Sequence, residues 1–324
     1  MTAGTVVVGG GISGIACASA MSEAGLAVEL RERGHRLGGR LASRTLRDTG
    51  TAYDGRVVDI GASYFTASDP GFAAAAASLK ARGIVHEWTD RFHVAGPGGI
   101  EAVSAGPMRY AAAGGLCSVV ADLARDLPRV TCRSPVGRVD SSSGAVLVDG
   151  FPAAAVALCM PGPQAARILA GLPAEVAPWE AVLAVTCVFD RSHWIDLDGV
   201  FVNDDAIITW IADDGSRRGD GAPVLVAHAS PALSARHLDD PTAVIALVIA
   251  AVQRVLGFSA HPAWVEVHRW TYARPRAATD ASFWLADDAN VGLAGDAFAG
   301  GPRVEAAWLS GRRLGAELAA RLRQ

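Results

Sequence analysis

Short apolar runs punctuate the first half of this chain, and the first of them is the most regular. Residues 6–8 are three consecutive valines, which is typical of a strand buried on both faces of a sheet. A helical pattern and a second strand at residues 28–32 follow, so residues 5–32 predict a β-α-β unit. Further strands are predicted at residues 57–62, 92–94, 130–132, 136–139, 146–148 and 155–159, and helices at residues 73–79 and 114–127.

The pattern changes after residue 181, where strands alternate with turns. A helix at residues 241–256 is the main exception, and an antiparallel sheet backed by one helix suits a second domain. The chain then returns to a strand at residues 290–296 and a helix at residues 306–323. The strands of the second domain are predicted at residues 183–189, 207–212, 224–229 and 265–270.

The turn after the first strand has the sequence Gly-Gly-Gly-Ile-Ser-Gly. Gly9 permits a tight turn, Gly11 lets the backbone approach a diphosphate, and Gly14 lets the next helix pack closely on the strand. The helix begins at Ile12 and Ser13, where free N–H groups and the helix dipole favour an anion. This segment predicts a phosphate-binding loop.

Glu32 ends the second strand, eighteen residues after Gly14. A carboxylate in this place can bind the hydroxyl pair of a ribose. A lone glycine triplet is weak evidence. Strand, glycines, helix, strand and acid in this order specifically indicate a dinucleotide site.

A Leu-Gly-Gly-Arg sequence that ends at Gly39 and Arg40 indicates which dinucleotide is bound. A Gly-Gly-Arg turn brings the chain close to a diphosphate and presents a permanent positive charge. The spacing from Glu32 to Arg40 resembles the glutathione-reductase-type FAD proteins, in the branch of the flavin amine oxidases and phytoene desaturases. The resemblance implies that Glu32 binds the adenosine ribose and that Arg40 lies near the pyrophosphate and flavin.

The end of the chain extends this resemblance. A predicted strand ends in Gly-Asp at Asp296, and the resemblance implies that this carboxylate contacts the ribityl chain or the pyrophosphate. Arg303 precedes the last helix and either contacts the flavin or its phosphates or forms a salt bridge with Glu305 or Asp296. The remaining residues that we expect to bind the cofactor are Arg33, Ala62, Val136 and Val304.

Several further segments resemble the bacterial renalase-type flavoproteins over about residues 5–322. The resemblance implies noncovalent FAD and a p-hydroxybenzoate hydroxylase-like fold. It also implies oxidation of the 2- and 6-dihydro isomers of NAD(P)H, with dioxygen as the acceptor and hydrogen peroxide as a product. The segments that carry it are residues 59–67, 161–165, 226–238, 268–275 and 301–305.

Hydride removal from an electron-rich ring needs no strong general base. Many flavin amine oxidases place a lysine–water pair at the flavin, but Lys80 is the only lysine here and falls on a predicted helix away from the flavin motifs. Two alternatives remain open: an amine oxidase or desaturase that acts on a secondary metabolite, and a protein that holds FAD only as a structural element.

The predicted fold class is α/β, with a Rossmann-like FAD-binding domain and a second, mainly antiparallel α+β substrate domain. The FAD-binding domain is discontinuous in this prediction. It comprises residues 1–66, 106–172 and 286–324, and the substrate domain comprises residues 67–105 and 173–285.

Five residues are predicted to line the substrate pocket. Tyr64 follows the turn expected beside the flavin, and it either forms a pocket wall or is an ordinary buried tyrosine. Trp210 either stacks over a flat ring or packs in the core. Trp270 and Tyr272 share one strand face, which either roofs the pocket or packs on the helix at residues 241–256. His228 either tunes the flavin or substrate or is a structural histidine.

One stretch departs from the renalase pattern. Residues 213–219 have the sequence Asp-Asp-Gly-Ser-Arg-Arg-Gly, where the pattern continues with Arg-Asn-Ser. If this stretch lines the pocket, its carboxylates would disfavour a phosphate-bearing substrate.

Composition restricts the partners. The net charge is −4, so neither nucleic acid nor an acidic membrane surface is an expected partner, and no membrane-spanning segment is visible. The five cysteines are widely spaced without a Cys-x-x-Cys pair, which predicts no metal site and a reduced, cytoplasmic protein. The expected partners are therefore a small-molecule substrate and dioxygen, and the oligomeric state is left open.

Overall fold

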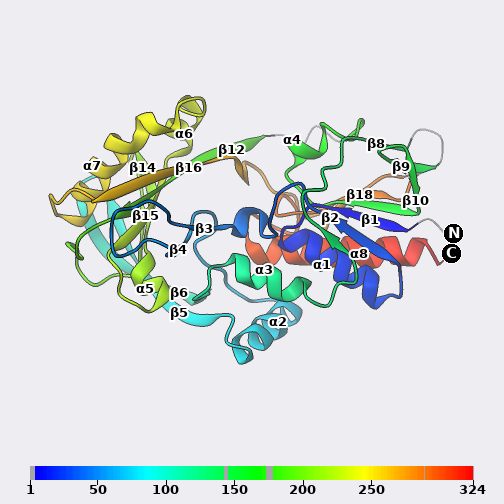
Figure 1. Ribbon diagram of the computed structural model, residues 1–324, viewed down its shortest axis with the longest axis horizontal. Helices are drawn as coiled ribbons and strands as arrows, with labels where there is room; N and C mark the ends of the chain where they lie inside the picture. Colours follow the sequence, from blue (N-terminus) through cyan, green and yellow to red (C-terminus); the bar gives the residue numbers. More distant parts are fainter. Residues whose placement is uncertain (1–3, 142–144, 173–177, 288, 324) are drawn as a thin grey trace.

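A six-stranded sheet lies at the right of Figure 1, on the side of the molecule where both ends of the chain are found. The computed structural model describes residues 4–141, 145–172, 178–287 and 289–323. All neighbouring strands of this sheet are parallel except one antiparallel pair at its edge, so the predicted β-α-β unit is confirmed. In sheet order the strands are Trp284–Leu285 (β17), Val291–Leu293 (β18), Ala155–Leu158 (β11), Thr5–Val8 (β1), Val28–Arg31 (β2) and Val130–Thr131 (β7).

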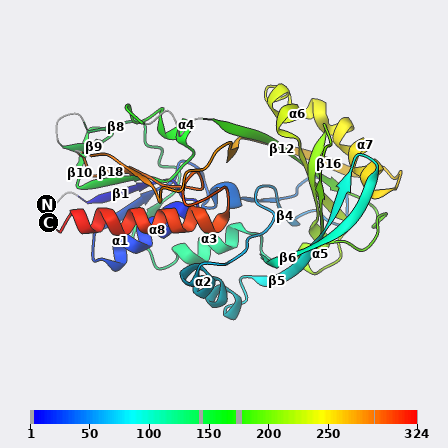
Figure 2. The same ribbon diagram turned by 180° about the vertical axis from the view of Figure 1, so that it is seen from behind.

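Two helices, α1 (Ile12–Glu23) and α8 (Val304–Arg321), lie side by side on one face of this sheet (Figure 2). Glycines allow the close approach, since a Cβ on Gly311 would lie 2.1 Å from the Ser13 carbonyl oxygen. The other face packs on a small three-stranded sheet. The remaining elements around this domain are α2 (Pro70–Ala81), α3 (Cys117–Ala124), β8 (Val139–Asp140), β9 (Val146–Val148), β10 (Phe151–Ala153) and α4 (Gly162–Ala165).

A seven-stranded, mostly antiparallel sheet forms the second layer at the left of Figure 1. Its outer face packs on the helices α6 (Pro231–Arg236) and α7 (Ile245–Leu256), and α7 follows the 3₁₀ turn Pro241–Val244. In sheet order its strands are Trp264–Pro275 (β16), Trp179–Val188 (β12), Val224–Ala229 (β15), Ile208–Asp213 (β14), Gly199–Val202 (β13), His86–Gly96 (β5) and Gly99–Ala111 (β6).

The hairpin of β5 and β6 is much longer than the strand predicted at residues 92–94. Residues 101–108 of β6 are all exposed, so no apolar alternation marks this strand in the sequence. Its backbone pairs along most of β5, and this pairing rather than burial defines the strand.

The two layers share short linking elements: a 3₁₀ turn at Gly39–Leu41, the ribbon of β3 (Ser43–Thr45) with β4 (Val57–Asp59), and α5 (Asp214–Arg218). The segment 67–105, predicted for the substrate domain, contributes to both cores. Phe72 and Leu79 of α2 pack in the core of the six-stranded sheet, whereas β5 belongs to the other sheet. The predicted boundaries at residues 1, 173 and 324 lie outside the described residues.

Candidate active site

A cavity of about 2040 Å³ lies between the two sheets. One wall is formed by the residues that follow β1, β2, β11 and β18, at the carboxyl ends of the parallel strands. Open α/β sheets bind ligands at this edge. The volume is roughly twice the ~1,000 Å³ upper end of ordinary ligand pockets, so a dinucleotide and a further molecule can occupy it together.

The glycine loop fits a diphosphate. Gly11 has φ −86°, which any residue adopts, and an added Cβ would meet only the Gly39 Cα at 3.8 Å. The protein itself therefore has no need of glycine there, whereas a closely approaching ligand does. No side chain caps α1, no acidic residue lies in its first turn, and the buried Ser13 hydroxyl has no partner among the described residues. These features suit a bound pyrophosphate.

Gly14 has a different task from Gly11. A Cβ on Gly14 would lie 1.9 Å from the Gly9 carbonyl oxygen, so this glycine serves the packing of α1 on β1. Gly14 does not line the cavity, whereas each of the other residues that we expected to bind the cofactor does.

Glu32 fixes the glycine loop as well as facing the cavity. Its carboxylate accepts hydrogen bonds from the Gly10 N–H at 2.7 Å and from the Gly34 N–H at 2.6 Å. These two bonds orient the carboxylate beside the loop, where a ribose would lie next to a bound pyrophosphate.

Replacing Glu32 by alanine should weaken FAD binding by about tenfold, because charge-assisted hydrogen bonds contribute roughly 1.5–3 kcal/mol each and the loop loses its anchor. The flavin-to-protein absorbance ratio after dialysis measures the effect. Glu23→Ala, on the far end of α1, is the matched control. A Glu32 variant that retains full flavin occupancy would contradict the assignment.

Arg40 and Asp296 meet at the cavity wall, although 256 positions separate them in sequence. The guanidinium donates two hydrogen bonds to the carboxylate, at 2.6 and 2.5 Å, and a third to the Ala273 carbonyl at 3.1 Å. Its guanidinium carbon lies 4.9 Å from the ring centroid of Trp179. The sequence predicted both side chains for cofactor binding but not their pairing, which joins the 3₁₀ turn to the end of β18.

The carboxylates of Glu305 and Asp296 both accept hydrogen bonds from groups other than Arg303. The Glu305 carboxylate accepts hydrogen bonds from the Ser68 hydroxyl and from the Ser68 and Asp69 N–H groups, at 2.6–2.7 Å. In the described part of the chain neither acid forms an ion pair with Arg303, so the salt bridge considered as an alternative is not formed. Arg303 instead lines the cavity at the start of α8.

A row of side chains crosses the seven-stranded sheet toward the cavity. Trp210 pairs with His228, His228 with Ala184, and Ala184 with His268 on the strands β14, β15, β12 and β16. Residues directly opposite one another on neighbouring strands project from the same face. Trp210 and the two histidines line the cavity, whereas Ala184 between the histidines is fully buried.

Trp270 and Tyr272 also line the cavity rather than packing on the helix at residues 241–256. The Trp270 indole N–H donates to the Ile60 carbonyl at 2.7 Å. The Tyr272 hydroxyl accepts a hydrogen bond from Arg167 at 2.8 Å. Trp270 therefore holds the loop after β4, and that loop carries the expected flavin contact Ala62.

Both histidines of this row are held neutral. Burial, followed by the charges of Arg217 and Arg274, lowers the pKa of His228 to about 4. Burial and the charge of Arg44 lower the pKa of His268 to about 4 as well. Near neutral pH this wall therefore presents uncharged rings to the cavity.

These shifts predict a pH dependence of stability. In the unfolded chain histidine titrates near pH 6.5, so between about pH 6.5 and 4 the unfolded state binds more protons than the folded state. The free energy of unfolding should therefore fall as the pH is lowered through this window. Urea titrations at several pH values give the free energy of unfolding at each pH. Between about pH 4 and 6.5 this free energy should change less steeply with pH for His228→Gln and His268→Gln than for the parent, and above about pH 7 the pH dependence should be the same. Equal slopes throughout would contradict the neutral assignment.

An aromatic cluster closes the end of the cavity near β5 and β6. The Tyr64 ring lies 5.2 Å from Phe92 and 6.0 Å from Trp210, measured between centroids. The Trp210 indole N–H donates to the Ser63 hydroxyl at 2.8 Å. Phe92 was predicted only as part of a strand, and Arg109 was not anticipated because it follows an exposed stretch of β6 without apolar alternation.

The hypothesis that residues 213–219 line the pocket is wrong. None of these residues reaches the cavity. Asp214 is fully buried and pairs with Arg217 at 2.5 Å and with Arg56 at 2.9 Å. Asp213 instead accepts hydrogen bonds from the Ser216 N–H and the Trp194 indole. The carboxylates belong to a structural ion network and do not oppose a phosphate-bearing substrate.

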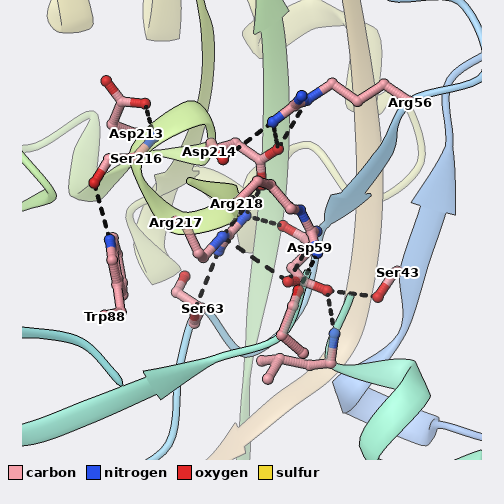
Figure 3. Close-up of polar contacts among 12 residues, drawn as sticks. Ser43, Arg56, Asp59, Ser63, Trp88, Asp213, Asp214, Ser216, Arg217 and Arg218 are labelled. Carbon is pink, nitrogen blue, oxygen red and sulfur yellow. Dashed lines mark hydrogen bonds and ion pairs between the residues drawn. The ribbon is translucent and has the colours of Figure 1, made fainter. Parts of the chain in front are cut away.

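The network joins α5 to the loop beside the cavity (Figure 3). Arg217, which is fully buried, donates to Asp214 and to the carbonyls of Asp59 and Ser63. Arg218 donates to the Asp59 carboxylate at 3.0 Å. Asp59 in turn accepts from the Ser43 hydroxyl and the Leu116 N–H, so the network ties β3, β4, α3 and α5 together.

Lys80, the only lysine in the sequence, is remote from this chemistry. It lies on α2, pairs with the exposed Glu87 at 2.6 Å and does not line the cavity. A lysine–water pair beside the flavin is therefore not available from this chain.

The parallel sheet, the glycine loop and the acid that follows β2 define a dinucleotide-binding protein. Residues 7–82 match the model of an NAD(P)-binding Rossmann-like domain, and residues 85–318 match the model of the flavin containing amine oxidoreductases. The chain belongs to the flavin-containing amine oxidoreductase family. It is an FAD-dependent oxidoreductase, and the cavity residues described above fit this cofactor.

Solved structures share the fold at low identity. Cyclohexylamine oxidase from Brevibacterium oxydans has a TM-score of 0.75 at 15% identity, over 99% of this chain and 100% of that chain. A putrescine oxidase bound to putrescine has a TM-score of 0.69 at 18% identity, over 98% and 99% of the two chains. These likenesses confirm the two-domain architecture. Within the described residues, no helix combines the length and apolar character needed to cross a bilayer.

Proposed function

We propose that this protein is a renalase-type oxidase with noncovalently bound FAD. It takes a hydride from a 2- or 6-dihydro isomer of NAD(P)H and passes the two electrons to dioxygen. The donor leaves as NAD(P)⁺, and dioxygen takes up two electrons and two protons to become hydrogen peroxide. Bound FAD would supply the redox chemistry, by accepting the hydride and passing the electrons on to dioxygen.

The charge of the cavity wall carries this proposal. Among the described residues eleven arginines line the cavity, against four carboxylates, although the whole chain has a net charge of −4. Four of these arginines, Arg31, Arg40, Arg44 and Arg274, pair with carboxylates, and the other seven form no ion pair with the described residues. Such a wall attracts a pyrophosphate-bearing donor in addition to FAD and repels a cationic amine.

The uncharged row of side chains on the seven-stranded sheet supports the same donor class. Trp210, His228 and His268 offer flat or neutral surfaces against which a dihydropyridine ring can lie. The wall holds no lysine, and hydride loss from an electron-rich ring needs no base from the protein. These side chains would orient the ring and exclude water.

Membership of the amine oxidoreductase family favours one alternative, oxidation of an amine or an alkene donor. The two functions differ in which compound reduces the flavin. Anaerobic mixing of the holoenzyme with 2- and 6-dihydro-NADH should bleach the flavin absorbance, and admitting air should release peroxide. No bleaching by these isomers in a protein that dithionite reduces would overturn the proposal. Bleaching by amines alone would favour the alternative.

A further inference from the structure

We propose that Arg109 binds an anionic group, a carboxylate or a phosphate, of the substrate. This inference concerns the substrate side of the cavity and rests on the proposed function only for the identity of the donor. Arg109 lies on β6, at the point where the exposed stretch of that strand becomes buried. The residue lines the cavity and is only 7% exposed.

The Arg109 guanidinium has no counter-charge from the described chain. Its Nε and Nη1 atoms are buried, and no described residue accepts a hydrogen bond from them. The groups around it are aromatic: the guanidinium carbon lies 4.0 Å from the Phe92 centroid and 5.6 Å from the Tyr64 centroid. Cation–π contacts contribute only about 0.5–2 kcal/mol each, which does not offset the burial of an unpaired charge.

Arg217 shows how this fold treats a buried arginine that serves structure alone. Arg217 is fully buried, pairs with Asp214 and donates to the carbonyls of Asp59 and Ser63. Arg109 is buried to almost the same degree without one such acceptor. The contrast indicates that the partner of Arg109 is a molecule that enters the cavity.

The surroundings define the chemistry of that molecule. Guanidinium groups bind carboxylates and phosphates through charge-assisted hydrogen bonds. Gly106 lets the guanidinium lie against the backbone of β6, since an added Cβ would lie 2.9 Å from Nη2. An anion next to the aromatic cluster would be desolvated and held strongly, whereas an ammonium group would be repelled.

The test measures binding of simple probes to the holoenzyme at constant ionic strength. Benzoate and inorganic phosphate are the anions, and benzamide is the neutral counterpart of benzoate. Flavin difference spectra and calorimetry give the dissociation constants. Arg109→Gln should weaken binding of at least one anion by about tenfold or more, with benzamide unchanged, and Arg109→Lys should lose less. The anion that is affected identifies the group as carboxylate or phosphate.

Arg91→Gln is the matched control, because this substitution removes the same charge from the same hairpin. The Arg91 side chain is 68% exposed. This variant should bind every probe as the parent does. The Arg109→Gln protein should also unfold at the same temperature as the parent or higher, since it loses an unpaired buried charge. A large loss of stability would indicate a structural role and overturn the proposal. So would equal anion affinities in parent and variant, or no binding of either anion to the parent.

Failure here is distinguishable from failure of the proposed function. If dihydronicotinamide isomers do not reduce the flavin but the anions bind through Arg109, the anion site stands and the donor is another compound. If the isomers reduce the Arg109→Gln protein with the dissociation constant of the parent, the oxidase stands and the anion site does not.

Discussion

Replacing Asp214 by alanine should lower the free energy of unfolding by about 3–5 kcal/mol, which is the usual effect of leaving a buried charge without its partner. Asp214 is fully buried between Arg217, Arg218 and Arg56. Burial alone would raise its pKa, but the three arginines together lower it, so the carboxylate is charged in the folded protein. Urea unfolding followed by far-UV circular dichroism measures the change.

Asp220→Ala is the control for this experiment. Asp220 pairs with the same Arg56, but its side chain is 50% exposed, so its loss should cost less than about 1 kcal/mol. Asp214→Asn keeps the shape and removes the charge, and it should be nearly as destabilising as Asp214→Ala. A loss for Asp214→Ala no larger than that of Asp220→Ala would contradict the role of the network.

The network also bears on the active site. Arg217 holds the carbonyls of Asp59 and Ser63, at the two ends of the loop that carries Ala62 and precedes Tyr64. Trp270 holds the same loop from the other side through Ile60. The ion network therefore places a cavity wall, although none of its charges on α5 faces the substrate.

The residues predicted for the cofactor half of the site were found from local signals, and all of them except Gly14 line the cavity. A glycine loop, its helix and the acid at the end of the next strand lie within a few tens of residues, and backbone geometry alone requires them. Period-two alternation likewise placed Trp270 and Tyr272 on one face, and both line the cavity.

Charged residues whose partners are distant in sequence were not predictable in this way. The run at residues 213–219 has the composition of a pocket wall or a solvated turn, and only tertiary contacts 158 positions away, to Arg56, show that it is buried. The pairing of Arg40 with Asp296 is equally long-range. No sequence pattern predicted that Arg109 belongs to the site, because it follows an exposed stretch of strand without apolar alternation.

Gly11→Ala should leave the protein without FAD folded but weaken FAD binding by at least about 100-fold, or roughly 2.7 kcal/mol. The backbone at Gly11 already has a conformation that alanine adopts, and the new methyl has space in the protein itself. The protein without FAD should even gain about 0.4–1 kcal/mol, since alanine restricts the unfolded chain. The methyl would instead occupy the place where the pyrophosphate approaches. Flavin fluorescence titrations of the FAD-free protein give the affinity, and urea titrations give the stability.

Gly11→Ala should thus lower the affinity for FAD while raising the stability of the FAD-free protein, which separates cofactor binding from folding. Gly14 provides a comparison in which folding itself is affected. Gly14→Ala should destabilise the protein itself, because its methyl would meet the Gly9 carbonyl oxygen at 1.9 Å. Gly25, with φ +82° and no atom within 4 Å of an added Cβ, lies beyond the end of α1, and its alanine variant should bind FAD as the parent does. If Gly11→Ala binds FAD with the affinity of the parent, the pyrophosphate does not lie against this glycine. The cavity would then have to hold the dinucleotide in another orientation.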